Sequence, residues 1–166
     1  MRRDVPVVFL LVGLTGSGKT TYSEQRLEPA GAVRLSVDEV LHDRHGRYGT
    51  DYPENTYVEK EAPVVAELHN QLRQLVAQGR DVVWDHGLWP RAQRDEMKKL
   101  VEEAGGRWRL LYFPVDREEL LRRLEERNRR QDANALFVTP EALDDFFARF
   151  EAPHGEGEET VGPDWL

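Results

Sequence analysis

The sequence contains no cysteine, and this absence excludes disulfide bonds, thiolate metal sites and cysteine nucleophiles. It also lacks any stretch that approaches the roughly 20 consecutive apolar residues of a membrane-spanning helix. The longest apolar run, Val5 to Val12, has the length of a strand and is not followed by a signal-peptide cleavage pattern. We therefore expect a cytoplasmic protein with no membrane partner.

The sequence also lacks an excess of positive charge, with 23 lysines and arginines against 31 acidic residues. The 166 residues carry a formal net charge of -8, which argues against broad electrostatic binding to nucleic acid. The charge is uneven, because arginines crowd residues 107–130 whereas residues 151–164 are acidic. A local anion site can therefore exist within an acidic protein.

Strand-like and helix-like segments alternate along the chain. Short apolar runs of strand length occur at residues 5–12, 33–37, 81–85 and 108–113. Amphipathic or capped segments predict helices over residues 19–27, 62–76, 91–104, 116–130 and 140–150. Such alternation predicts an α/β fold of three layers, with a central parallel sheet, right-handed βαβ units and helices on both faces.

We expect one domain over residues 1–152 and an exposed acidic tail over residues 153–166. The polar stretch 42–57 contains glycine and proline and shows no period, which predicts a loop or mobile flap. Its His42, Asp43 and His45 are expected at the surface rather than at a metal, because a polar flap provides no fixed ligand geometry. Pro63 is expected in the first turn of the helix that follows.

The segment from Gly13 to Thr20 matches the phosphate-loop motif G-x-x-x-x-G-K-S/T completely, between a predicted strand and a predicted helix. Glycines allow positive φ, so successive N–H groups point inward and bind phosphate at the positive end of the helix. Lys19 is expected to reach the β- and γ-phosphates, and the Thr20 hydroxyl to ligate Mg²⁺. The motif thus predicts ATP and Mg²⁺ as cofactors, with the nucleotide held by Gly13, Thr15, Gly16, Ser17, Gly18, Lys19, Thr20 and Thr21.

Two acids follow predicted strands. Asp38 either caps the turn after its strand or is the general base that accepts a proton from an acceptor hydroxyl, and the neighbouring phosphate loop favours the base. Asp85 either holds Mg²⁺, binds the acceptor or caps the next helix. Because parallel strands end at one edge of a sheet, Gly13, Asp38 and Asp85 are expected to converge there.

Arg123 and Arg127 lie four residues apart, on one face of a predicted helix. They either form a solvated face paired with glutamates or point together at the triphosphate; the second interpretation is favoured because phosphoryl transfer needs cations supplied in cis. A candidate acceptor pocket follows the third strand. Its members are Asp38, Asp85, His86, Trp89, Arg91 and Arg94, although Trp89 is alternatively a core anchor.

Four segments, GLTGSGKTT, SVDE, VVWDHGLWPRAQRDE and YFPVDREELLRRLEERN, together resemble the AAA_33-type P-loop kinase family over most of the chain. That family is similar to chloramphenicol phosphotransferase, zeta toxins and the kinase domain of polynucleotide kinases. The resemblance implies a sheet ordered 2-3-1-4, Asp38 as base, and a basic lid with Arg123 and Arg127. No fifth strand is evident after the lid, so the sheet either stops at four strands or recruits the tail.

Three functions remain open. The favoured one is transfer of the ATP γ-phosphate to a hydroxyl of a small molecule, namely a metabolite, a nucleotide sugar or an antibiotic. A nucleic-acid 5′-hydroxyl kinase would need a basic groove leading to Asp38, for which Arg44, Arg47, Arg91 and Arg94 are the candidates. The third is a regulatory nucleotide-binding or NTPase module without an acceptor.

Overall fold

The computed structural model describes residues 5–14, 16–46, 57–127, 129 and 140–162. At its centre is a parallel sheet of five strands in the spatial order β2-β3-β1-β4-β5, so the expected order 2-3-1-4 is confirmed. The strands are β1 (Val7–Val12), β2 (Val33–Ser36), β3 (Val82–Asp85), β4 (Arg107–Tyr112) and β5 (Glu158–Thr160).

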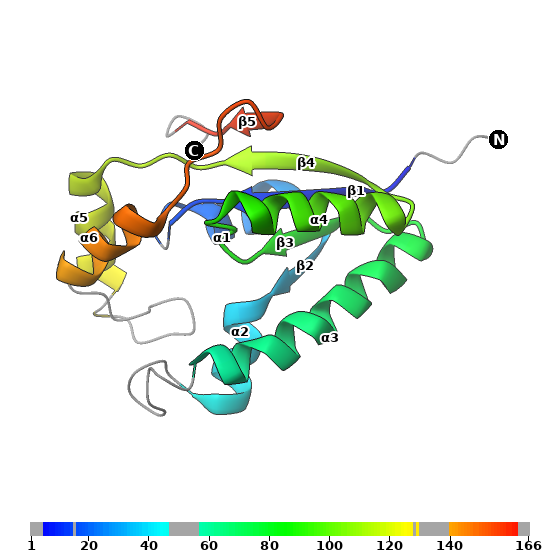
Figure 1. The fold of residues 1–166 in the computed structure, drawn as a ribbon, viewed down its shortest axis with the longest axis horizontal. Coiled ribbons are helices and arrows are strands. Elements are labelled where there is room, and N and C mark those ends of the chain that lie inside the picture. The colour runs from blue at the N-terminus through cyan, green and yellow to red at the C-terminus, as the bar shows by residue number, and fades with distance from the viewer. Residues whose placement is uncertain (1–4, 15, 47–56, 128, 130–139, 163–166) are drawn as a thin grey trace.

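Helices cover both faces of the sheet and the carboxyl ends of its strands (Figure 1). One face is covered by α3 (Tyr57–Ala77) and α4 (Arg91–Glu103), and the other by α1 (Lys19–Tyr22) with the π-helix η1 (Ser23–Leu27). Near the carboxyl ends of the strands lie α2 (Val37–His45), α5 (Arg117–Arg127) and α6 (Pro140–Arg149). None of the helices in the described residues combines the length and apolarity needed to cross a membrane.

The central strands are buried on both faces. Val8, Leu10, Leu11 and Val12 of β1 have no exposed surface, and all four residues of β3 are buried. Even residues of β1 pack with α3 and α4, whereas Leu11 packs with η1. A strand covered on both sides needs a continuous apolar run rather than an alternating one, and this is why β1 could be recognised from the sequence.

The fifth strand comes from the segment that was expected to be an exposed tail. Residues 158–160 pair in parallel with β4, and the Val161 N–H donates to the Tyr112 carbonyl at 2.7 Å. Glu156 is buried as well. The segment therefore pairs with the sheet and buries Glu156, although Gly157, Glu159 and Thr160 are exposed, and the alternative in which the sheet recruits the tail is confirmed. Pairing with β5 gives hydrogen-bond partners to backbone N–H and C=O groups at the edge of β4, which would otherwise be unpaired.

Two local expectations also need correction. Residues 42–45 belong to α2 rather than to a loop, because Val37 and Leu41 are buried one turn apart and Arg44 pairs with Glu67 of α3 at 2.8 Å. The rest of the expected flap, residues 47–56, lies outside the described residues. Pro63 is the seventh residue of α3 and not part of its first turn, because the helix begins at Tyr57.

Replacing Pro63 with alanine should stabilise the protein. The proline lies in the interior of α3, where it removes a backbone donor, and it is exposed, so little packing is lost on substitution. We expect Pro63→Ala to raise the free energy of unfolding by about 1 to 3 kcal/mol. Urea denaturation measures this, with Ala66→Gly one turn further along as a control that should have the opposite sign. Destabilisation by Pro63→Ala would contradict the continuous helix.

Candidate active site

The phosphate loop connects β1 to α1 and depends on its glycines. Gly16 and Gly18 have φ angles of 85° and 100°, which side chains rarely adopt. At Gly13 the constraint is space, since a Cβ atom would lie 2.6 Å from Ser17 Oγ and 3.2 Å from the Phe113 carbonyl oxygen. The loop therefore accepts no side chain at these three positions without moving.

The side chains at the end of the loop point to the carboxyl ends of the strands. Lys19 Nζ donates to the carbonyl oxygens of Gly13 and Leu14 at 3.0 and 3.2 Å. Thr20 Oγ1 donates to Asp85 Oδ2 at 2.8 Å. Thr21 follows in α1 and is exposed, and Thr15 lies outside the described residues. The expected meeting of the loop with the Asp85 strand is thus present.

Asp85 and Thr20 form an oxygen pair that suits a hard divalent cation. A hydroxyl and a carboxylate are the ligand types that Mg²⁺ prefers, and Mg²⁺ takes most of its remaining ligands from water and substrate phosphate. Within the described ranges no three metal-binding side chains gather. The donor set therefore fits an Mg²⁺ held jointly with a nucleotide rather than one held by the protein alone.

Arg34 of β2 contacts Asp85 of this pair, and the sequence did not identify it as a site residue. Its side chain is largely buried, with Nη2 2.7 Å from Glu39 Oε1 and Nη1 3.5 Å from Asp85 Oδ2. Glu24 and Glu28 lie slightly further from the same guanidinium. The sequence feature that could have identified it as a site residue is the presence of an arginine within the short apolar strand VRLS. Its contact with Asp85 Oδ2 helps to orient that carboxylate toward Thr20 of the loop.

Asp38 occupies the first turn of α2, and another residue fulfils the capping role considered for it. The N-cap is Ser36, whose hydroxyl accepts from the Glu39 N–H at 3.3 Å. Solvent reaches Asp38, and its side chain forms no hydrogen bond or ion pair with another described residue. Its carboxylate is therefore free to act on a ligand.

Several charged groups act on the Asp38 carboxyl. Desolvation among the surrounding protein atoms raises its pKa above the ordinary value; the charges of Asp85 and Glu61 add to this, while His86 and Lys19 oppose it. Solvent access to the side chain limits the size of the effect. The same interactions place Asp38 in one electrostatic neighbourhood with Lys19 and Asp85, as strand-end convergence predicts.

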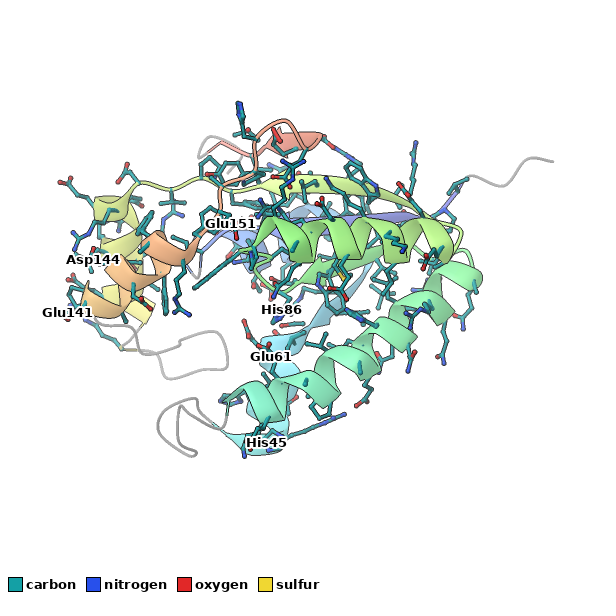
Figure 2. The ribbon with its side chains drawn as sticks, in the orientation of Figure 1. His45, Glu61, His86, Glu141, Asp144 and Glu151 are labelled. Carbon is teal, nitrogen blue, oxygen red and sulfur yellow. The ribbon has the colours of Figure 1, made fainter. Side chains whose placement is uncertain are left out.

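A histidine and a glutamate lie beside this neighbourhood. Figure 2 shows His86, just after β3, opposite Glu61 of α3, and the distance from His86 Nε2 to Glu61 Oε2 is 3.8 Å. The Trp84 ring meets His86 edge-on, with centroids 6.3 Å apart. His86 was a predicted site residue, whereas Glu61 was not, because nothing in a helical pattern separates it from other surface glutamates.

The structure does not bring the other members of the expected acceptor pocket together. Trp89 packs on Phe146 of α6 with ring centroids 5.0 Å apart, which agrees with its alternative role as a core anchor. Arg91 is exposed and lies 3.7 Å from Asp95. Arg94 is buried in an ion pair elsewhere. The turn after β3 leads into α4, which runs back along the sheet (Figure 1), and Trp89 in the turn is bonded to Gly13 at 3.3 Å.

Arg123 of α5 contacts the phosphate loop directly. Its Nη1 donates to the Gly16 carbonyl at 3.3 Å, and its Nε is bonded to Glu119 at 2.9 Å. Hydrogen bonds from Arg122 and Arg123 lower the pKa of Glu119 to about 2, so the glutamate stays ionised and holds Arg123 in place. The side chain of Arg127 and most of the expected lid lie outside the described residues.

A pocket of about 250 Å³ opens beside the loop, between the end of β4 and α6. Its walls are mostly apolar and include Leu14, Phe113, Val115, Phe147 and Phe150. Among the described residues, no charged side chain lines it. The pocket therefore does not suit phosphate, which belongs at the N–H groups and Lys19 of the loop.

Comparison with known proteins agrees with this geometry. The family model AAA_33, an AAA domain, matches residues 8–153, a range that includes the phosphate loop, Asp38, Asp85 and α5. A search of curated protein sequences found no significant match.

Solved structures share the fold at low sequence identity. The APS kinase of Mycobacterium tuberculosis, in complex with AMPPNP and APS, is 17% identical with a TM-score of 0.65, over 97% of this chain and 90% of that one. A gluconokinase from Sinorhizobium meliloti 1021 is 23% identical with a TM-score of 0.62, over 100% and 86%. A chain of the Pnkp1/Rnl/Hen1 RNA repair complex is 20% identical with a TM-score of 0.71, over 89% of this chain and 45% of that one. At these identities the likeness establishes the fold.

Replacing Asp38 with asparagine should stabilise the folded protein at neutral pH. A carboxyl whose pKa is raised on folding is less favourable when ionised in the folded state, so its destabilising effect is absent below the unfolded pKa of about 3.9 and grows as pH rises. We expect Asp38→Asn to raise the melting temperature at pH 7, and the gain to shrink as pH falls toward 4. Asp43→Asn, on the exposed side of the same helix, is the control. An equal or lower melting temperature for Asp38→Asn at pH 7 would show that the ionised Asp38 carboxylate does not destabilise the folded protein.

Proposed function

The chain belongs to the AAA_33 family of AAA domains, and from this premise we propose that it is an ATP-dependent phosphotransferase. It transfers the γ-phosphate of ATP to a hydroxyl group of a small molecule, and Asp38 is the general base. The observation that carries the proposal is the meeting of phosphate loop, Asp85 and Asp38 at one edge of the sheet. Phosphoryl transfer needs a phosphate cradle, a metal position and a base in one place.

Nucleotide binding uses groups that are already oriented. The N–H groups around Gly16 and Gly18 face the β-phosphate, and Lys19 exchanges its carbonyl partners for phosphate oxygens. Mg²⁺ held at Thr20 and Asp85 would neutralise charge on the β- and γ-oxygens. Arg123, which contacts the Gly16 carbonyl of the loop, would stabilise the charge that develops on the transferred group.

The transfer step assigns a proton to Asp38. The acceptor oxygen forms a bond to the γ-phosphorus as the bond from that phosphorus to the β,γ-bridging oxygen breaks, and the hydroxyl proton passes to the Asp38 carboxylate. A raised pKa makes this carboxylate a stronger base than an ordinary aspartate. Because Ser36 caps the helix, Asp38 can accept the proton without loss of local structure.

The charges beside Asp38 favour a neutral or cationic acceptor. Glu61 and Asp85 both make the ionisation of Asp38 less favourable. Mg²⁺ bound at Asp85 would neutralise one of these carboxylates, but an anionic acceptor, including a nucleotide sugar, would still meet Glu61 beside Asp38. A hydroxylated metabolite or an aminoglycoside-like antibiotic fits this environment better.

A nucleic-acid acceptor is the weaker candidate. Three of the four arginines considered for its groove are paired with carboxylates: Arg44 with Glu67, Arg91 with Asp95 and Arg94 with Glu156. Arg47 lies outside the described residues. A single-strand groove needs unpaired cations and stacking aromatics along the backbone. The fold shared with a chain of an RNA repair complex keeps this acceptor in the test.

Transfer of labelled γ-phosphate tests the proposal. The acceptor panel contains neutral polyols, aminoglycosides, sugar phosphates, nucleotide sugars and 5′-hydroxyl oligonucleotides. Lys19→Ala should abolish transfer, and Asp38→Asn should keep nucleotide affinity within about twofold while slowing transfer by at least about 100-fold, the size of a general-base effect. Asp43→Asn should transfer at the wild-type rate.

The outcomes separate the three functions. Labelled small molecule that disappears in Asp38→Asn supports the proposal, and labelled oligonucleotide would replace it with the nucleic-acid kinase. Acceptor-independent phosphate release that persists in Asp38→Asn would favour the NTPase module. Full transfer by Asp38→Asn would place the base elsewhere.

The proposed metal position yields a separate prediction. Asp85→Asn removes a charge that faces the Thr20 hydroxyl at 2.8 Å. We expect Mg²⁺ to tighten ATP binding by about tenfold less in Asp85→Asn than in the wild type, while ATP affinity measured in EDTA is unchanged or higher. Calorimetric titrations with and without Mg²⁺ measure both quantities. An unchanged Mg²⁺ effect would exclude Asp85 as a metal position.

A further inference from the structure

We propose that the buried ion pair between Arg94 and Glu156 positions the phosphate loop, so that the C-terminal segment 151–158 is part of the nucleotide-binding apparatus. The inference rests on the proposed function in one respect, namely that the loop binds nucleotide. It concerns residues that contact no nucleotide themselves and act through the turn between β3 and α4.

The pair itself is closed and specific. Arg94 Nε and Nη2 donate to the two carboxylate oxygens of Glu156 at 2.8 and 2.9 Å, and the two side chains are 1% and 2% exposed. This bidentate contact lowers the pKa of Glu156, which therefore stays ionised. The guanidinium is thus fixed in direction by a residue 62 positions away in the sequence.

The remaining donor group of Arg94 holds the turn after β3. Nη1 donates to the carbonyl oxygens of Leu88 and Trp89 at 2.9 and 2.8 Å. Gly87 and Leu88 have φ angles of 76° and 51°, and Leu88 is the one residue other than glycine with positive φ among those described. Such a strained turn persists only when surrounding contacts hold it in place. The two hydrogen bonds from Arg94 Nη1 provide this support.

The same turn holds the first residue of the phosphate loop. The Gly13 N–H donates to the Gly87 carbonyl at 3.2 Å, and Trp89 Nε1 donates to the Gly13 carbonyl at 3.3 Å. Both backbone groups of Gly13 are therefore bonded to the turn. Asp85 and His86 immediately precede it, so a shift of the turn would move the proposed metal position and the start of the loop together.

The C-terminal segment contacts this assembly at further points. Lys98 Nζ donates to the Glu156 carbonyl at 2.7 Å, and the His154 N–H donates to the Glu156 carboxylate at 3.3 Å. The Glu151 N–H donates to the Trp89 carbonyl at 3.2 Å. The segment therefore reaches the turn both directly, through Glu151, and indirectly, through Arg94.

Stability alone does not explain a charged pair at this place. Two well-packed apolar side chains usually stabilise a core at least as well as a buried ion pair. An apolar pair, however, cannot donate to two adjacent carbonyl oxygens in a strained turn. The planar guanidinium donates to the carboxylate on one side and to the two carbonyl oxygens on the other. The pair therefore fixes the orientation of the turn, which apolar side chains could not do.

The experiment compares three proteins with the wild type. Glu156→Gln breaks the ion pair, the double variant Arg94→Met with Glu156→Leu replaces it by apolar side chains, and Glu159→Gln is the matched control. Glu159 lies on β5, three residues after Glu156, and binds Arg109 in the same bidentate manner, but both side chains are half exposed and these hydrogen bonds do not involve the turn. All four are measured at a temperature at which each is folded.

Two readouts are used. Hydrogen exchange of the free protein follows amides in residues 13–20 and 86–90, and fluorescence titration with ADP gives nucleotide affinity. We expect Glu156→Gln to accelerate exchange in both segments and to weaken ADP binding by at least about fivefold. The double variant should recover the melting temperature but neither the exchange protection nor the affinity, and Glu159→Gln should match the wild type.

The contrary results are distinct. Wild-type exchange and affinity in the double variant would reduce the pair to a structural role and overturn the inference, even if Glu156→Gln fails to fold. A wild-type protein that binds no ADP would contradict the proposed function, and the exchange data would still decide whether Arg94 and Glu156 hold the loop. Faster exchange in Glu159→Gln equal to that in Glu156→Gln would assign the effect to loss of β5 in general.

Discussion

The parallel pairing of β1 with β3 is the constraint on which the site depends. The register places Leu11 opposite Asp85, so the carboxylate lies beside the end of β1 and within hydrogen-bond reach of Thr20 in the turn of helix that follows the loop. On the other side of β3, Ser36 of β2 is opposite Asp85. Asp38 follows two residues later, in the first turn of α2, and therefore lies at the same edge of the sheet. A register shift of one residue would turn Asp85 to the other face and separate all three groups.

Three arginines act individually at the candidate site of this acidic protein. Arg34 orients Asp85 from below, Arg123 contacts the phosphate loop at Gly16, and Arg94 holds the turn that holds Gly13. Each is fixed by a carboxylate and presents its remaining donors to one defined group. In the proposed function, positive charge would thereby be directed at a single triphosphate, without the extended basic surface that a polyanion requires. This arrangement reconciles a net charge of -8 with an anion site.

Local features of the site could be predicted from the sequence, whereas its long-range contacts could not. The phosphate loop has a fixed spacing, and the convergence of Asp38 and Asp85 follows from strand ends in a parallel sheet. The partner of Arg94 lies 62 residues away in a segment with no hydrophobic period, so Arg94 was mistaken for an acceptor residue. The three residues of β5 are too few to show alternation. The length of α2 depends on tertiary contacts such as Arg44 with Glu67, which propensity does not contain.

Asp38 shows why the catalytic interpretation is stronger than a structural one. Folding does not require a carboxylate at this position, because Ser36 already caps α2 and no described residue forms an ion pair with Asp38. Desolvation and the charges of Asp85 and Glu61 make its ionisation less favourable, so a neutral side chain would serve the fold better. A carboxylate that opposes stability beside a phosphate loop is consistent with the proposed role of Asp38 as a general base. Proton acceptance from a hydroxyl is the role that its raised pKa and its proximity to Lys19 together support.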